Sequence, residues 1–397
     1  MTSEAALPDP HRTGTGPLRR MTARSRDEAH RTATPLELFF DLCFVVAVAQ
    51  AGGQLALNLA EGHLAHGISG YAFAFFGIWW AWMNFSWFAS AYDVDDVAYR
   101  VTTLVQITGV LILAAGVPRV FADNDLTLAV VGYVVMRLAM VTQWLRAAAA
   151  ETGGARTMAY RYAAGITVCQ AGWVLALQLP HDVLPYVLPL GILAELSLPA
   201  LAERHTQSAW HPHHIAERYG LFTLIVLGET VSAATVAMQT ALDEHEAVGE
   251  LLPIAGGGLL ICFAAWWIYF ARPVHDHLAS NRQAFLWGYG HYLVLGSAAA
   301  IGAGLEVAVE HAVGKSHVSA AAATAAVTVP TALYLVTVWA LHARYSKTGA
   351  SQWVLPVAAV ATLACTAAGQ SGVLLAGLVS AAAIAVGVVL HARQSPV

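Results

Sequence analysis

Two carboxylates stand at the start of the first long apolar stretch of the chain. Glu37 and Asp41 are four residues apart, so a helix would place both on one face. Acidic groups near a helix N-terminus interact favourably with the helix dipole. Two close carboxylates can also share a proton or bind a cation, because like charges favour protonation of one of them. The pair is a candidate ion or proton site, and helix capping with a bridge to an arginine is the structural alternative.

A second acidic group lies between two later apolar stretches. Asp93, Asp95 and Asp96 occur within four residues, and Arg100 follows them. A carboxylic acid kept protonated by its neighbours can act as a general acid, and soluble cyclases that protonate an isoprenoid alkene use an Asp-x-Asp-Asp pattern. The alternative is a solvated acidic loop with an internal salt bridge to Arg100, which is also a candidate ion or substrate contact.

A third group opens an apolar stretch in the second half of the chain. His214, Glu217 and Arg218 occur there together, and helical spacing of three residues lets the first two side chains converge. The spacing suits a proton relay, an ion pair or a transition metal. A complete set of metal ligands is missing, so we predict no metal site, and capping is the structural alternative.

Three further charged residues fall inside apolar stretches. Glu229 lies twelve residues beyond Glu217, which is about 18 Å along a helix. Burying a charged side chain in hydrocarbon costs roughly several kcal/mol unless the charge is paired or hydrated. Arg137 is the expected partner of Glu229, and Glu195 is the other candidate. A buried structural pair and a role in gating or substrate contact are both consistent with this placement.

The composition indicates what must hold these residues in position. Of 397 residues, 57% are hydrophobic and 11% are charged, whereas soluble proteins carry about 25% charged residues. We therefore predict an all-α, polytopic membrane protein with about 12 transmembrane helices. The predicted spans are 37–59, 71–91, 101–118, 126–147, 161–179, 184–201, 215–239, 252–271, 284–306, 318–342, 353–369 and 373–391.

The basic residues predict the orientation of these spans. With the N-terminus inside, 17 of the 20 Lys and Arg residues fall in the tails and inner loops. Only Arg119 and Lys315 fall outside, and Arg137 lies within a span. Because cytoplasmic loops carry an excess of Lys and Arg, we expect a plasma-membrane protein with both termini in the cytoplasm.

The chain also carries a weak internal repeat. Two acidic helix starts lie 180 residues apart, and the tryptophan pairs 79–80 and 266–267 lie 187 residues apart. These offsets predict two parallel six-helix repeats at 35–201 and 213–391, although such features also recur by chance. We expect a disordered basic cytoplasmic tail at 1–34, a cytoplasmic linker at 202–212 and a second tail at 392–397.

Three motifs resemble those of the bacterial low temperature requirement protein A family. They are residues 34–47 (TPLELFFDLCFVVA), residues 79–80 (WW) with 95–100 (DDVAYR), and residues 214–222 (HIAERYGLF) with 228–229 (GE). Their order matches the family, and the resemblance covers about residues 34–390. It implies a multi-pass bacterial membrane protein, but it implies no reaction and transfers no catalytic or transport residues.

Three functions are compatible with these residues. The leading hypothesis is a proton- or cation-coupled transporter or channel, in which Asp41 and Glu229 contact the ion and Arg137 is the counter-charge. The alternative is a membrane enzyme acting on a lipid or isoprenoid, with the aspartate cluster as general acid. The third is a non-catalytic membrane component. We expect the lipid bilayer and a small ion or solute as partners, with no nucleic acid and no cofactor; a homo-oligomer is left open.

Overall fold

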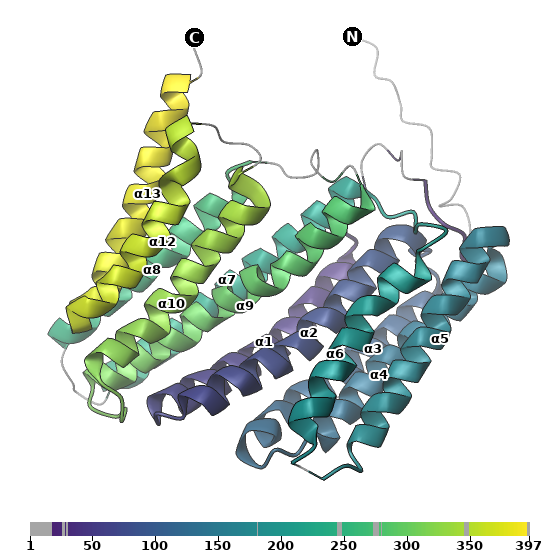
Figure 1. Cartoon of the computed structure of the whole chain (residues 1–397), viewed down its shortest axis with the longest axis horizontal. Coiled ribbons are helices and arrows are strands. Elements are labelled where there is room, and N and C mark those ends of the chain that lie inside the picture. The colour runs from purple at the N-terminus through teal and green to yellow at the C-terminus, as the bar shows by residue number, and fades with distance from the viewer. Residues whose placement is uncertain are drawn as a thin grey trace. The chain divides into compact units, whose positions relative to one another are not determined.

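A computed structural model describes residues 18–25, 28, 31–180, 182–243, 248–272, 278, 280–344 and 349–394. Within these residues every regular element is helical (Figure 1). The α-helices are α1 (Pro35–Ala60), α2 (Leu64–Tyr92), α3 (Val97–Ala122), α4 (Thr127–Ala150), α5 (Gly153–Ala176), α6 (Leu184–Ala202), α7 (Pro212–Asp243), α8 (Val248–Phe270), α9 (Asn281–Ala312), α10 (Ala320–Val338), α12 (Val354–Ala364) and α13 (Gly372–Gln394). A π-helix, η2 (Trp339–Ala343), follows α10, and the 3₁₀ segments η3 (Gly349–Trp353) and η4 (Cys365–Ser371) flank α12.

The described residues form two compact units. Unit 1 contains the described residues within Met1–Ala29, Trp87–Gly109 and Val134–His211. Unit 2 contains the described residues within His30–Ser86, Val110–Tyr133 and Pro212–Val397. In unit 1, α5 packs against α6, and in unit 2, α9 packs against α1, α7 and α10 while α13 packs against α8 and α12. Each unit therefore has helix pairs that bury polar side chains between them.

Nine helical segments of the described chain are long and apolar enough to cross a membrane. They are Pro35–Ala60, Val97–Ala122, Thr127–Ala150, Leu184–Ala202, Pro212–Val236, Gly249–Phe270, Asn281–Ala312, Ala320–Ala343 and Gly349–Ala392. The all-helical, multi-span prediction is confirmed. The number 12 stays a prediction, because α2 and α5 are not among the nine and because one segment contains both α12 and α13.

A capping box fixes the start of α1. The Thr34 hydroxyl oxygen accepts a hydrogen bond from the Glu37 backbone N–H at 3.3 Å, and the Thr34 backbone N–H donates to Glu37 Oε2 at 2.8 Å. Pro35 occupies the first helical position, where its missing N–H costs nothing. Local sequence therefore orients the Glu37 carboxylate before any tertiary contact forms.

The basic N-terminal segment has defined contacts in its described part. Residues 18–25 have no regular secondary structure, and the Arg19 backbone N–H donates to Asp96 Oδ2 at 2.7 Å. Arg20 Nη2 donates to the Ala150 carbonyl at 2.9 Å, and the Arg24 backbone N–H donates to the Ala91 carbonyl at 2.9 Å. This part of the predicted tail therefore follows the helix ends of unit 1, whereas residues 1–17, 26–27 and 29–30 lie outside the described residues.

Close packing of α9 on α10 supplies a first prediction. A Cβ added to Gly304 would overlap the Ala326 carbonyl group, so Gly304→Ala forces the two backbones apart. We expect a loss of about 1–3 kcal/mol in the free energy of unfolding, measured by denaturant unfolding in detergent micelles. Gly52→Ala is the matched control, since open space surrounds that position in α1; an equal loss in both variants would contradict the packing argument.

Candidate functional site

Four charged or titratable side chains meet between α1 and α7 in unit 2. Arg218 Nη2 lies 2.6 Å from Asp41 Oδ1, and Arg218 Nη1 lies 3.2 Å from Glu37 Oε1. His214 Nε2 lies 3.1 Å from the same Glu37 oxygen. All four side chains are fully buried. We call Glu37, Asp41, His214 and Arg218 the α1–α7 cluster.

Helix α2 closes this cluster with polar and aromatic contacts. The Trp82 indole N–H donates to Asp41 Oδ1 at 2.7 Å, and Arg218 Nη2 donates to the Ser86 hydroxyl at 3.2 Å. The guanidinium carbon of Arg218 lies 5.9 Å from the centre of the Phe85 ring, within the range of a cation–π interaction. The helix therefore holds both the arginine and one oxygen of Asp41 in place.

Two carboxylates of the α1–α7 cluster share one guanidinium, that of Arg218. A second buried arginine, Arg31, lies close enough to act electrostatically on His214. Asp41 Oδ2 is buried and has no hydrogen-bond partner among the residues that the structure describes. A buried polar atom without a partner is costly, and a proton on Asp41 or a bound cation would satisfy this oxygen. Glu217, half-buried on α7, adds another carboxylate next to Arg218 in the chain.

In unit 1, the charged residues inside the helices form a separate ion pair. Arg137 Nη2 lies 2.8 Å from Glu195 Oε2, and both side chains are buried. Gln170 and Trp173 donate to the other oxygen, Glu195 Oε1, at 3.1 and 3.3 Å. Of the two candidates that the sequence offered, Glu195 is the one paired with Arg137, and both of its carboxylate oxygens have donors.

Glu229 is half-buried on α7, and it forms no salt bridge within the described part of the chain. The expected pairing of its carboxylate with the Arg137 guanidinium is therefore not observed. The next residue, Thr230, lines a cavity of about 270 Å³ between α7, α8 and α9. Most of the other lining side chains are apolar, including Leu259 and Leu305. Glu229 itself is not among the residues that line this cavity.

The acidic residues at the start of α3 are held by arginines and by backbone groups. Asp96 Oδ2 lies 2.6 Å from Arg146 Nη2, and Asp95 Oδ1 lies 2.7 Å from the exposed Arg100 side chain. Asp93 Oδ1 accepts from the Asp95 backbone N–H at 3.0 Å, and Asp95 has a positive φ of 45°. These contacts match the structural alternative of a salt-bridged loop and give the general-acid hypothesis no support.

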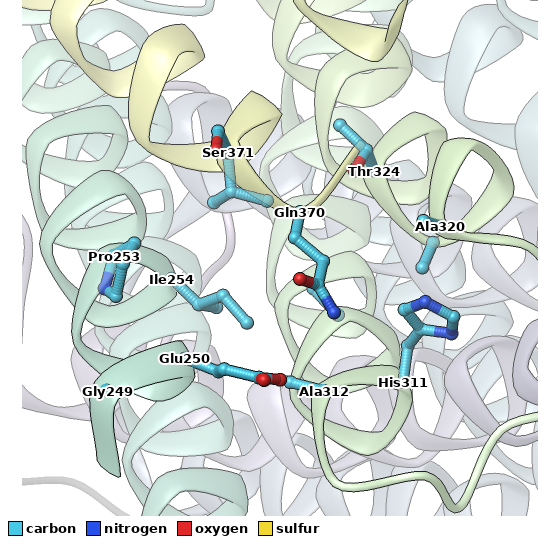
Figure 2. A pocket seen from close by; sticks show the side chains of 13 residues that line it. Gly249, Glu250, Pro253, Ile254, His311, Ala312, Ala320, Thr324, Gln370 and Ser371 are labelled. Carbon is cyan, nitrogen blue, oxygen red and sulfur yellow. The ribbon is translucent and has the colours of Figure 1, made fainter. Parts of the chain in front are cut away.

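A small cavity with polar lining residues was not anticipated from the sequence. It has a volume of about 160 Å³, and Glu250, His311, Thr324 and Gln370 are among its lining residues. Figure 2 shows the Gln370 amide and the Glu250 and His311 side chains directed toward the same space from different elements. These residues lie at helix ends, where polar residues are ordinary, so no local signal distinguished them.

The nine apolar segments and the ion pairs buried among the described helices define a multi-pass helical membrane protein. A family model described as "Bacterial low temperature requirement A protein (LtrA)" matches residues 32–392. The chain belongs to the LtrA family, which confirms the resemblance carried by the three sequence motifs.

A relative in Rhizobium meliloti (strain 1021) bears the name "Uncharacterized protein RA0937". It is 26% identical to this chain over 283 residues. The alignment covers 66% of this chain and 65% of that protein. The name of the relative states no ligand or reaction, so the functional argument depends on the residues of this chain.

Proposed function

We propose that the protein is a proton- or cation-coupled transporter or channel. The observation that supports this proposal is the α1–α7 cluster, in which two buried carboxylates face one guanidinium. A buried carboxylate oxygen without a partner can accept a proton or contact a cation. Ionisable residues inside a membrane commonly mark ion or proton pathways, and Asp41, with one oxygen lacking a partner among the described residues, is the residue we assign to the ion.

The spacing of the paired residues supports two repeats. His214 and Glu37 are 177 residues apart, as are Arg218 and Asp41. The prolines that begin α1 and α7, Pro35 and Pro212, have the same separation. Equivalent residues of two repeats can meet where the repeats face each other across a symmetry axis. We therefore propose parallel repeats at 35–201 and 213–391, giving twelve spans in the plasma membrane with both termini in the cytoplasm.

The proposal is tested by reconstituting the purified protein in liposomes. Proton, sodium, potassium and small-solute fluxes are measured for the wild type and for Asp41→Asn. We expect wild-type flux of at least one species and a loss of about tenfold or more in the variant, because the amide removes the carboxylate that we assign to the ion. Asp123→Asn, at an exposed position, is the control and is expected to match the wild type.

Two outcomes would contradict transport. The first is no wild-type flux of any species from protein that runs as a single, folded peak in size-exclusion chromatography. The second is equal flux for Asp41→Asn and the wild type. A change in the lipid or isoprenoid profile of cells lacking the gene, combined with absent flux, would instead favour the enzyme alternative.

A further inference from the structure

A second group of buried titratable side chains lies in unit 2. His291 of α9 is fully buried, and its Nε2 atom lies 2.9 Å from the hydroxyl of Tyr269, on α8. His342, on the π-helix η2, accepts the Trp287 indole N–H at 3.1 Å, and its ring centre lies 5.6 Å from that of His291 and 4.8 Å from that of Tyr269. Single π-helical turns occur frequently at functional sites. The α1–α7 cluster uses none of these residues.

The hydrogen bonds determine where the proton sits on His291. Its Nδ1 atom lies 2.7 Å from the Trp287 carbonyl oxygen, which can only accept. Nδ1 must therefore carry a hydrogen. In the neutral ring, Nε2 is then the acceptor and receives the Tyr269 O–H. His291 has one lone pair available for an added proton, and that lone pair points at a hydroxyl group.

The same logic assigns a different role to His342. An indole N–H can only donate, so Nε2 of His342 accepts the bond from Trp287 and carries no hydrogen. Protonation at that atom would break the bond. His342 is therefore a positioning residue, which fixes the Trp287 side chain.

Aromatic rings surround His291 and would stabilise it as a cation. The centre of its ring lies 4.1 Å from the Trp287 ring, 4.8 Å from the Tyr219 ring and 5.8 Å from the Tyr269 ring. Ring faces attract cations within about 6 Å. Tyr219 directly follows Arg218 in α7 and also contacts Trp82, with ring centres 4.8 Å apart. The surroundings of His291 are therefore aromatic, they include a second histidine, His342, with ring centres 5.6 Å apart, and they adjoin the α1–α7 cluster.

We propose that Tyr269 and His291 form a proton-binding pair that carries protons to or from the α1–α7 cluster. This inference rests on the proposed transport function and assigns the proton as a transported or coupled species. In the loading step, Tyr269 passes its hydroxyl proton to His291 Nε2 while its oxygen takes a proton from a hydronium ion. Two O–H bonds break, that of Tyr269 and one of the hydronium ion; one N–H bond on His291 and one O–H bond on Tyr269 form, and water leaves. Tyr269 ends neutral, His291 carries the added proton, and the bond from Nδ1 to the Trp287 carbonyl is kept.

The experiment separates proton movement from cation movement. Liposomes contain the wild type, Tyr269→Phe, His291→Gln or Tyr71→Phe, with a pH-sensitive dye inside for proton flux and a potassium-sensitive dye in parallel samples. Tyr71→Phe is the matched control, because Tyr71 is also a buried phenol but donates to a backbone carbonyl, that of Gly296, at 2.7 Å. Tyr269→Phe removes a single oxygen atom, so it remains informative if His291→Gln fails to fold.

We expect both relay variants to lose proton flux by about tenfold or more, with Tyr71→Phe close to the wild type. Wild-type proton flux in Tyr269→Phe and in folded His291→Gln would overturn the relay and leave the proposed transport intact. Absence of proton flux in the wild type would also overturn it, while potassium flux sensitive to Asp41→Asn would still support transport. Absence of every flux would remove both proposals.

Discussion

Replacing Arg218 with glutamine is expected to destabilise the protein by about 3–5 kcal/mol. The guanidinium is the one cation that contacts both Glu37 and Asp41 in the described structure. Without it, Glu37 keeps the contacts to His214 and Thr34 and Asp41 keeps the Trp82 N–H, but neither buried carboxylate has a guanidinium partner. The loss is measured as the free energy of unfolding in a denaturant titration of the protein in mixed micelles.

Arg218→Lys is the matched control for charge. An ammonium keeps the positive charge but cannot form the forked contact to two carboxylates, so we expect a smaller loss than for Arg218→Gln. Adding Asp41→Asn to Arg218→Gln should recover part of the stability, because one uncompensated carboxylate is then neutral. If Arg218→Gln unfolds at the wild-type denaturant concentration, the α1–α7 cluster does not stabilise the fold as described.

The second large effect is expected at the Arg137–Glu195 pair of unit 1. Arg137→Met leaves a buried carboxylate, Glu195→Leu leaves a buried guanidinium, and each should cost about 3–5 kcal/mol. The double variant removes both charges and should be much closer to the wild type, since apolar replacements of a buried pair are often nearly neutral. Unfolding free energies of all four proteins form a double-mutant cycle.

If the double variant lost as much unfolding free energy as Arg137→Met and Glu195→Leu lose together, the two side chains would not interact as described. Arg146→Met with Asp96→Leu provides a comparison cycle at a pair in which the arginine is partly exposed. Water screens part of that interaction, so each single substitution there should cost less.

Features set by neighbouring residues, such as a helix start, can be predicted from the sequence. Which charged residue pairs with which distant one cannot. The predicted first span starts at residue 37, whereas the helix starts at Pro35 with Thr34 as its cap; the capping groups lie within one turn, so this start is the kind of feature that local sequence can supply. The contact of Asp41 with Arg218 joins residues 177 positions apart, and nothing in their local sequence selects one arginine from the others.

The same limit explains the ion pair of unit 1 and the polar cavity. A buried guanidinium predicts a carboxylate partner, but Glu195 and Glu229 both satisfied that requirement until the packing of the helices was known. Glu250 and His311 looked like ordinary helix-end residues, and the cavity that they line depends on how several elements meet. The sequence shows which charged residues lie inside apolar stretches. It does not show which distant helix ends come together.

The capping box at Thr34 has a mechanical consequence. Glu37 satisfies the first backbone amide before α1 with Oε2, and it faces Arg218 and His214 with Oε1. If Arg218 or His214 moved away and the Glu37 carboxylate rotated with it, the Thr34 backbone N–H would lose its acceptor. The first turn of α1 would then lose its cap. A change in charge at Arg218 or His214 would therefore affect the first turn of α1 through the Glu37 side chain.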